Sequence, residues 1–310
     1  MIDPKISIVT PSFNQAEFIE DTMRSVICQN YPNLEYIVID GGSSDASASI
    51  IERYSDRLSH WVSEPDGGHG AGLNKGFCMS TGEIMGWINS DDLLTPWSLR
   101  TVAEIFSKFS HVNWIQGLAS SWNRQGQLTG SIRNPINIYD YLTRNYAWIQ
   151  QESVFWRRSL WDKAGGAISE DMHLMVDGEL WSRFFLHDEL YLVDCILGGW
   201  RCHGLNRAIQ YSEACHQEMD QIISTMADRC DPEILKRANM LRSILNIASF
   251  SPIRQIFGTT TAQVALGMTI GSTFAKKLFH EAGYRRISWD VGKNDWVEST
   301  LPFRSIKNWF

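Results

Sequence analysis

The stretch GWINSDDLLTPW (residues 86–97) joins a buried-strand pattern to a cluster of polar side chains. Residues 84–88 are apolar and rich in strand-forming types, and the polar run NSDD (89–92) follows directly. Two adjacent carboxylates at a strand end suit a hard divalent cation, which takes a few carboxylate oxygens and leaves positions for phosphate. A helix-capping Asp or a solvated turn explains the two acids equally well when they are considered alone.

The first hundred residues alternate short strands with helical patterns. Apolar runs typical of buried strands occur at 6–10, 35–40, 60–63 and 84–88. Helical patterns lie between them, and Asn14 with Glu17 fits a capping box for the first helix. Strands separated by helices form parallel βαβ units, so the pattern predicts an α/β fold. Ligands of such sheets bind beyond the carboxyl ends of the strands, which makes residues 1–100 a candidate nucleotide-binding half.

Acidic residues follow three of these strands in succession. Asp40 ends the second strand, Asp66 follows the third, and Asp91 and Asp92 follow the fourth. The glycines between 67 and 72 match neither G-x-x-x-x-G-K-[ST] nor G-x-G-x-x-G, the two common phosphate-loop motifs, so this loop has another purpose. Acids gathered at one crevice accept hydrogen bonds from a nucleobase N–H or from ribose hydroxyls, while a metal neutralises a pyrophosphate.

Composition limits the function and the expected location. The chain has 310 residues and a formal net charge of −7, which argues against a general nucleic-acid binder. Its six cysteines form no C-x-x-C pair, which favours a reducing compartment. The first residues lack the pattern of a signal peptide, and no uninterrupted apolar run reaches about 18 residues. We therefore expect a cytoplasmic protein.

The strand–helix alternation stops near residue 206, which divides the chain in two. We expect one α/β domain over 1–210 and a mostly helical region over 211–310, whose last part, 251–310, is ambiguous. The weakly apolar segment 259–279 fits either a packing helix or a helix lying on a membrane surface. The packing helix is the favoured alternative, and peripheral contact with the inner face of the membrane is the other.

Several motifs, in this order, resemble those of family 2 glycosyltransferases. They are VTPSFNQAEFIEDTMRSVICQNYPNLEYIVIDGGSSD (9–45), SEPDGGHGAGLNKG (63–76), TGEIMGWINSDD (81–92) and VDGELWSRF (176–184). The similarity covers roughly residues 5–205. It implies the GT-A fold, a Rossmann-like, mainly parallel mixed sheet flanked by helices, here with a helical C-terminal region. It also implies inverting transfer of a sugar from a nucleotide diphosphate.

The resemblance assigns roles to individual residues of this chain. Residues expected on the nucleotide side are Thr10, Pro11, Phe13, Asp40, Asp66, Asn74 and Asp91. Asp92 is expected to bind Mg²⁺ or Mn²⁺, with His203 as a further metal or pyrophosphate contact or, equally, a packed structural residue. The chain departs from the family pattern at Asn89, where an acid is frequent, and at Gly41, where a second Asp is frequent.

The catalytic base requires a separate argument. Inverting transfer needs a carboxylate that takes the proton from the acceptor hydroxyl. MVDGELWSRFF (175–185) places Asp177 on the family's base position, and Glu179 is the competing acid. Either acid could instead favour the helix N-terminus through the helix dipole. Gln151 and Glu152 are expected to face the acceptor side of the cleft.

Together these features predict a metal-dependent, inverting transferase in polysaccharide biosynthesis. Family habit favours a UDP-sugar donor, with a saccharide or polyprenyl-linked acceptor. Two alternatives remain: a catalytically degenerate sugar-nucleotide-binding partner subunit, supported by Asn89 and Val176, and a nucleotidyltransferase. The latter is disfavoured because its basic Gly-rich signature near the first strand is missing. A glycoside hydrolase, which also uses two carboxylates, does not need acids at three nucleotide-side strand ends.

Overall fold

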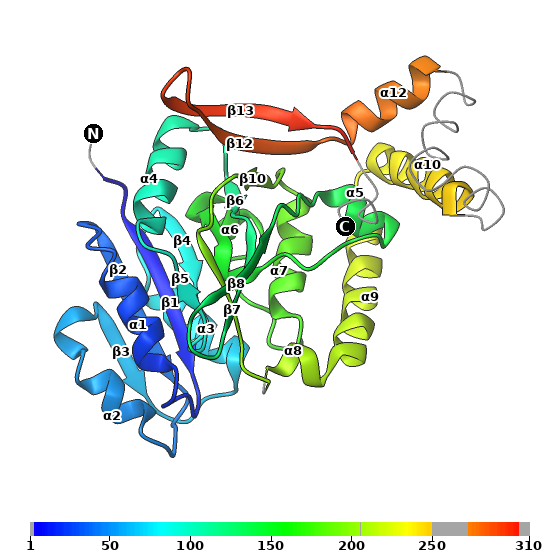
Figure 1. Cartoon of the computed structure of the whole chain (residues 1–310). Coiled ribbons are helices and arrows are strands. Elements are labelled where there is room, and N and C mark those ends of the chain that lie inside the picture. The colour runs from blue at the N-terminus through cyan, green and yellow to red at the C-terminus, as the bar shows by residue number, and fades with distance from the viewer. Residues whose placement is uncertain (1–2, 205, 250–271, 304–310) are drawn as a thin grey trace.

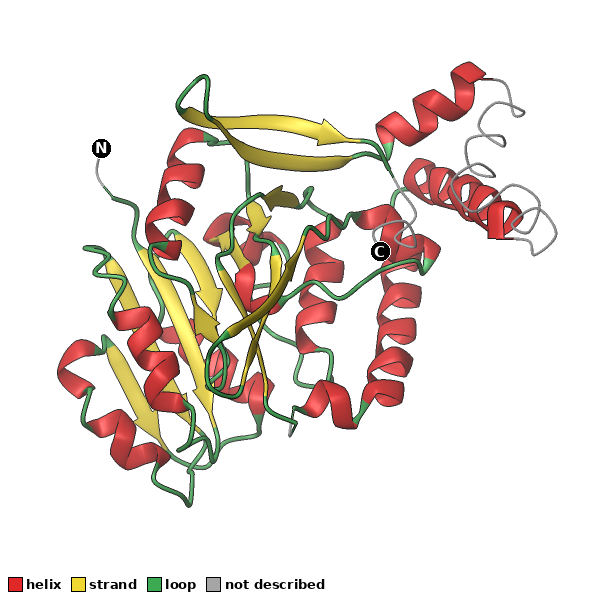
Figure 2. Ribbon diagram, viewed as in Figure 1, coloured by secondary structure: helices red, strands yellow, loops and turns green. Residues whose placement is uncertain are grey.

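The computed structural model describes residues 3–204, 206–249 and 272–303 (Figure 1). Its centre is a nine-stranded sheet with the order β13-β12-β10-β6-β9-β4-β1-β2-β3. Figure 2 shows helices on both faces of this sheet. In this view β1 runs downward, so the carboxyl ends of the parallel strands of the N-terminal half lie at the bottom of the molecule.

The N-terminal half has the predicted alternation of strands and helices. Its parallel strands are β1 (Ile6–Ser12), β2 (Leu34–Asp40), β3 (His60–Ser63) and β4 (Ile84–Trp87). Its helices are α1 (Ile19–Ile27), α2 (Ser47–Glu52), the short 3₁₀ turn η1 (Ser55–Arg57), α3 (His69–Met79) and α4 (Ser98–Lys108). The predicted parallel α/β arrangement is thus confirmed for these strands.

The side chains of β1 point alternately into two hydrophobic cores, one on each face of the large sheet. Ile6 and Ile8 join the core under α1, α2 and α4, whereas Val9 joins the core under α3. Successive side chains of a strand point to opposite faces, so a strand buried on both faces is apolar at nearly every position. Gly76 lets α3 lie close to β1, because a Cβ there would be 2.4 Å from a methyl group of Val9.

The capping box predicted at Asn14 and Glu17 is wrong. α1 begins at Ile19, and Asn14 has a φ of 53°. The side-chain oxygen of Asn14 accepts the N–H of Ser44 at 2.9 Å, so this residue joins two loops instead of capping a helix. Glu17 forms an ion pair with Arg124. Long-range contacts have replaced the local bonds expected from the spacing.

The rest of the large sheet contains antiparallel strands that the alternation did not indicate. It consists of β6 (Trp114–Gln116), β9 (Val154–Arg157), β10 (Tyr191–Val193), β12 (Tyr284–Asp290) and β13 (Asp295–Leu301). β9 lies antiparallel between β4 and β6, and β12 pairs parallel with β10. The sheet is therefore mixed but mainly parallel, as expected for the fold class.

A second, four-stranded sheet lies beside the carboxyl end of β4. Its strands, in spatial order, are β5 (Leu93–Leu94), β11 (Gly198–Cys202), β7 (Ala119–Asn123) and β8 (Leu128–Ile132). β5 follows the acids 91–92 directly and pairs with β11, which ends just before His203. The small sheet therefore brings residue 203 back to the acids that follow β4.

The remaining helices belong to the second half of the chain. They are α5 (Ile138–Thr143), the 3₁₀ turn η2 (Gln151–Ser153), α6 (Arg158–Lys163), α7 (Val176–Phe185), α8 (Arg207–Gln210), α9 (Ser212–Arg229), α10 (Pro232–Ser249) and α12 (Ser272–Glu281). α5, α7 and α9 pack against one another (Figure 1). The helices from α8 onward form the helical C-terminal region.

The C-terminal region also contains a hairpin that sequence patterns did not indicate. β12 and β13 lie within 211–310 and extend the large sheet beyond β10. The division of the chain at residue 210 stays a prediction. Of the segment 259–279, residues 259–271 lie outside the described part. None of the described helices is long and apolar enough to cross a membrane.

Candidate active site at the carboxyl ends of the strands

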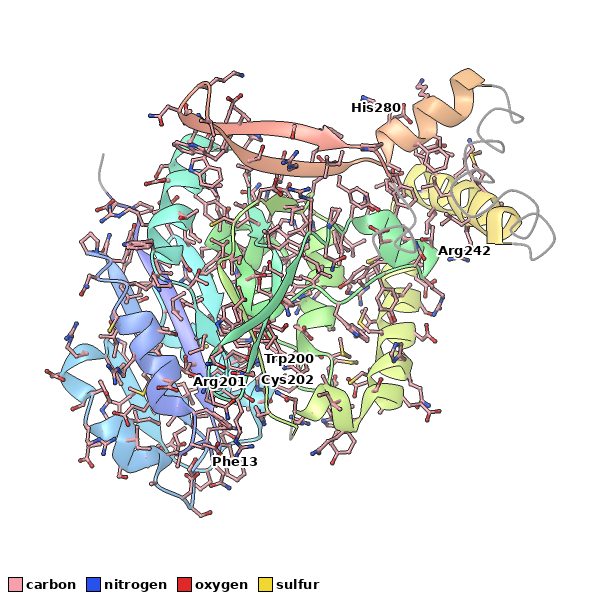
Figure 3. All side chains as sticks on the ribbon, viewed as in Figure 1. Phe13, Trp200, Arg201, Cys202, Arg242 and His280 are labelled. Carbon is pink, nitrogen blue, oxygen red and sulfur yellow. The ribbon has the colours of Figure 1, made fainter. Side chains whose placement is uncertain are left out.

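The predicted nucleotide-side residues lie where β1, β2 and β3 end, but they differ in accessibility. Phe13 follows β1 and is 61% exposed (Figure 3). Pro11 is buried within β1. Thr10 is fully buried, and its hydroxyl lies 3.0 Å from the hydroxyl of Tyr36 in the core. Of these three side chains, the ring of Phe13 alone is open to a ligand.

Asp40 holds together the turn that follows β2. Its carboxylate accepts hydrogen bonds from the N–H of Ser43 at 2.9 Å, the Ser43 hydroxyl at 2.5 Å and the Ser63 hydroxyl at 2.7 Å. These donors replace the water that a buried carboxylate would lose. Asp40 therefore stabilises the junction of β2 and β3, and a nucleotide contact by its side chain stays a prediction.

Asp66 occupies a space bounded by two glycines. A Cβ at either Gly41 or Gly72 would lie 3.1 Å from a carboxylate oxygen of Asp66. The N–H of Gly68 donates to the same carboxylate at 2.7 Å. The departure from the family pattern at Gly41 thus has a steric reason, because a second Asp would crowd Asp66.

Asn74 binds the protein itself. Its amide nitrogen donates to the backbone oxygen of Ile168 at 3.0 Å and to Glu170 at 2.8 Å. Its amide oxygen accepts the N–H of Ile168 at 2.7 Å. These bonds fasten the loop before α7 to α3, and the nucleotide contact predicted for Asn74 stays a prediction.

Asp91 and His203 meet across the small sheet. The Nε2 of His203 lies 3.0 Å from Oδ2 of Asp91. Phe18 stacks on the imidazole at 4.7 Å between ring centroids. The side chain of Asn206 accepts the backbone N–H of His203 at 3.0 Å and donates to the backbone oxygen of Arg201 at 2.9 Å. The imidazole is thus held beside a carboxylate, and its contact with a metal or a pyrophosphate stays a prediction.

Asp92 differs from Asp91 because its side chain is only 1% exposed. Its Oδ1 accepts the N–H of Arg201 at 2.8 Å, and its Oδ2 accepts the amide of Asn89 at 3.2 Å. Burial, together with the negative charges of Glu152 and Asp91, raises the pKa of Asp92 well above its ordinary value. An acid at position 89 would add a further negative charge beside Asp92, whereas Asn89 donates a hydrogen bond to it.

Gln151 and Glu152 lie in the interior beneath Asp92. Both side chains are buried, and the amide of Gln151 donates to the backbone oxygen of Trp87. Burial raises the pKa of Glu152, and the charges of Asp177 and Asp91 raise it further. Their burial leaves the predicted contact with the acceptor a prediction. The charges of Asp91 and Asp177 both act on Glu152, so this residue is near both acids.

Asp177 lies in the first turn of α7. Burial raises the pKa of its carboxyl group to about 6, although N–H groups of Gly178 and of Asp177 itself favour the charged form. Glu179, the competing acid, forms an ion pair with Arg183 at 2.7 Å, and Arg183 also donates to the backbone oxygen of Ala167. Glu179 is therefore engaged in an ion pair, and the role of Asp177 as the base stays a prediction.

Two residues of α9 hold the first turn of α7 from outside. The carboxylate of Glu218 accepts the N–H groups of Leu174 and Met175 at 3.0 and 2.9 Å. The sulfur of Met219 occupies the space beside Gly178, where a Cβ would be 2.5 Å away. Sequence reasoning missed this contact because no spacing links α9 to a helix more than 30 residues earlier.

His69 and Arg207 are further site residues that the motifs did not indicate. Burial and the positive charge of Arg207 lower the pKa of His69 to about 4, while the charge of Asp91 acts in the opposite direction. Arg207 donates to the backbone oxygen of His173 at 2.9 Å, next to α7. A neutral imidazole and a guanidinium therefore lie near the acid that follows β4.

The site offers part of a coordination sphere for a divalent metal. In the part of the chain that the structure describes, no three His, Cys, Asp or Glu side chains are grouped so that they could hold a metal. The side chain of Asp91 is 19% exposed, whereas that of His203 is 4% exposed and its Nε2 lies 3.0 Å from Asp91 and 3.2 Å from the amide nitrogen of Asn206. Mg²⁺ and similar ions are commonly bound through one or two carboxylates, with substrate phosphates and waters completing the sphere. Of this pair, Asp91 fits that mode of binding.

Sequence comparisons agree with the architecture. Residues 7–158 match the model of glycosyl transferase family 2. An uncharacterized glycosyltransferase of Rickettsia typhi is 32% identical over 108 residues, which are 35% of this chain and 34% of that protein. One of Mycobacterium tuberculosis is 28% identical over 200 residues, which are 63% of this chain and 74% of that protein. The matched part thus spans about a third of the Rickettsia protein.

Solved structures show the same fold at low sequence identity. Residues 1–349 of S. aureus TarS, in complex with UDP-GlcNAc, are 13% identical with a TM-score of 0.62, covering 96% of this chain and 99% of that one. A mannosyltransferase of Pyrobaculum calidifontis, in complex with GDP-Man and Mn²⁺, is 19% identical with a TM-score of 0.52, covering 91% and 80%. The fold is the GT-A α/β fold. Residues 7–158 of the chain thus carry the pattern of glycosyl transferase family 2.

Proposed function

We propose that this site transfers a sugar from a nucleoside diphosphate to an acceptor hydroxyl, with inversion at the anomeric carbon. The observation that carries the proposal is that two groups of different chemistry both lie near Glu152. One is the Asp91–His203 pair, suited to a metal and a diphosphate. The other is Asp177, a half-buried carboxyl group with a pKa of about 6. A leaving-group site beside a general base is what inverting transfer requires.

The donor diphosphate would bind at Asp91, His203 and Arg207. We propose Asp91 as the ligand of Mg²⁺ or Mn²⁺ in place of Asp92, with His203 holding its carboxylate in position, because both oxygens of Asp92 are used inside the protein while the Asp91 side chain is 19% exposed. The metal would neutralise charge that develops on the departing diphosphate. The Arg207 guanidinium, close to His69 and Asp91, would add positive charge on the same side.

A uridine nucleotide is the donor that we propose. TarS, which has this fold, is known in complex with UDP-GlcNAc. The exposed ring of Phe13 at the end of β1 offers a surface on which a pyrimidine can stack. Asp66, next to the glycine loop, would accept hydrogen bonds from the base or the ribose. The acceptor would be a saccharide, free or polyprenyl-linked, in polysaccharide biosynthesis.

In the chemical step the acceptor oxygen attacks the anomeric carbon. A bond forms between these atoms while the bond from the anomeric carbon to the diphosphate oxygen breaks. The proton of the acceptor hydroxyl passes to the carboxylate of Asp177. Partial removal of this carboxylate from water raises its pKa, so it holds a proton better than a fully solvated Asp would.

A donor panel tests the proposed function. Purified protein is incubated with UDP-, GDP- and dTDP-sugars, with and without Mn²⁺ and with a mixture of saccharide acceptors. We expect nucleoside diphosphate release that requires the metal and increases with acceptor, with an inverted anomeric configuration in the NMR spectrum of the product. Donor binding without release would favour the partner-subunit alternative, and pyrophosphate release from a nucleoside triphosphate would favour a nucleotidyltransferase.

The pH dependence of transfer should report the base. Because the pKa of Asp177 is about 6, the base is ionised above that pH and protonated below it. We therefore expect kcat to fall about tenfold for each pH unit below the pKa in the donor–enzyme complex. The measurement is kcat from about pH 5 to pH 8 at saturating donor and metal. A profile that is flat across this range would contradict a carboxylate base with a raised pKa.

Glu218 should position the base without touching substrate. Glu218→Ala leaves the N–H groups of residues 174 and 175 without their acceptor, so the first turn of α7 should loosen. We expect kcat to fall about tenfold with the donor dissociation constant unchanged. Glu218→Gln keeps a carbonyl oxygen and should restore most of kcat. Glu213→Ala, on the exposed start of α9, is the matched control. Equal kcat values for all three variants would remove Glu218 from this role.

A further inference from the structure

A row of aromatic rings runs from the neighbourhood of Asp177 to the surface. The row consists of Tyr141, Tyr146, Trp148 and His216, with successive ring centroids 5.6, 5.5 and 5.1 Å apart. Tyr141 is buried, Tyr146 is half-buried, and Trp148 and His216 are exposed. These residues come from α5, the loop after it and α9, elements that pack together.

The inner end of the row lies beside the proposed base. Burial and then the charge of Asp177 raise the pKa of Tyr141. Burial, followed by the charges of Glu218 and Asp177, raises the pKa of Cys215, the residue before His216. α7, which carries Asp177, packs against both α5 and α9. The row thus lies on the elements that pack against the helix of Asp177.

The outer end of the row is held in place by the protein. The backbone oxygen of Trp148 accepts the side-chain N–H of Asn134 at 3.2 Å. His216 Nδ1 lies 2.7 Å from the backbone oxygen of Ser212, which fixes this ring relative to α9. The rings of Tyr146 and His216 both meet the indole at steep angles, 62° and 66°. Trp148 remains 41% exposed between them.

We propose that Trp148, with Tyr146 and His216 beside it, is a stacking platform for a sugar ring of a saccharide acceptor. This inference rests on the proposed function, because Asp177 defines where the reacting hydroxyl lies. The apolar C–H face of a pyranose covers an indole ring well, while its hydroxyls need polar neighbours. Here the imidazole of His216 and the ion pair of Arg144 with Asp220 lie on the same side of the molecule, in α9 and at the end of α5. The platform would bind a sugar beyond the one that reacts.

The composition around Trp148 favours a saccharide over a lipid chain. A lipid chain needs a contiguous apolar surface, whereas Trp148 is a single exposed ring beside the polar residues Arg144, Asp220 and His216. Exposure alone does not single out this indole. Trp97, at the start of α4, is 74% exposed, and Trp289, on β12, is 45% exposed. Neither of them belongs to the row that leads to Asp177.

Direct binding tests the platform without requiring turnover. Saturation-transfer NMR is recorded with maltose, cellobiose, chitobiose and lactose on the wild type, Trp148→Ala, Trp148→Phe and the control Trp289→Ala. We expect at least one disaccharide to bind the wild type and the control, with about tenfold weaker binding to Trp148→Ala. Trp148→Phe keeps a ring and should retain most of the affinity. No binding to the wild type, or equal binding to Trp148→Ala, would overturn the proposal.

Kinetics on the same variants separate this inference from the proposed function. With the disaccharide as acceptor, Trp148→Ala should raise the acceptor KM about tenfold. The donor KM and acceptor-independent nucleotide release should not change, because the row does not contact the donor side. Disaccharide binding that depends on Trp148 without any transfer would leave the platform standing and refute the transferase. Transfer with an unchanged acceptor KM in Trp148→Ala would support the transferase and refute the platform.

Discussion

Replacing Asp177 with Asn is expected to lower sugar transfer by about 10² to 10⁴-fold. Asn keeps the size of the side chain and its place in the first turn of α7, but it cannot accept the proton of the acceptor hydroxyl. A base acts mainly in the transition state, so binding of donor and metal should remain close to wild type. Transfer is measured by product formation, and donor affinity by calorimetry with the nucleoside diphosphate and Mn²⁺.

Glu179→Gln is the matched control for this prediction. Its carboxylate pairs with Arg183 four residues later, so the substitution should cost some stability and little activity. An inactive Glu179→Gln beside an active Asp177→Asn would show that the base lies one half-turn further along the helix. Full activity in both variants would exclude a carboxylate base on α7.

Asp177→Asn should also stabilise the fold at neutral and alkaline pH. The folded protein raises the pKa of this acid to about 6, above the ordinary value of 3.8. The charged carboxylate therefore opposes folding above pH 6, and this cost disappears below about pH 4. We expect the Tm of Asp177→Asn to exceed that of the wild type near pH 8 and to match it near pH 4. Loss of activity with a gain of stability is typical of a functional residue.

Replacing Asp91 with Asn is expected to abolish metal-dependent donor binding. The substitution removes a charged ligand from the Asp91–His203 pair, which lowers affinity for Mg²⁺ or Mn²⁺ and leaves the diphosphate without its counter-charge. We expect donor affinity in the presence of metal to fall by about 100-fold or more, and transfer with it. The measurement is calorimetry of the nucleoside diphosphate with and without Mn²⁺, where the difference reports the metal.

Asp92→Asn distinguishes the two neighbouring acids. Its amide oxygen can still accept the N–H of Arg201, and its raised pKa already favours an uncharged group at this position. We therefore expect Asp92→Asn to fold and to bind donor and metal nearly as the wild type does. If Asp92→Asn loses metal binding while Asp91→Asn keeps it, Asp92 is the ligand and its internal hydrogen bonds must rearrange.

Patterns within short segments were sufficient for the architecture of the N-terminal half. β1 and β2 are buried at nearly every position because both faces of the sheet are covered, and their apolar runs can be identified by inspection. The acids after β2, β3 and β4 lie at one edge of the sheet, because parallel strands end on the same side. A family motif surrounds Asp177 and places it in the first turn of α7, where the structure has it.

The partners of those acids depend on contacts between residues far apart in the chain, which spacing does not encode. Asp92 is buried because β11 returns more than 100 residues later and its Arg201 donates a backbone N–H to the carboxylate. The sequence motif places Asn74 on the nucleotide side, but in the structure the loop at 168–170 is bonded to its amide group. Sequence determined which residues are chemically able to act and on which edge of the sheet they lie. Tertiary structure decided which carboxylates keep access to a ligand, because burial and hydrogen bonds from distant strands and helices set both their charge and their exposure.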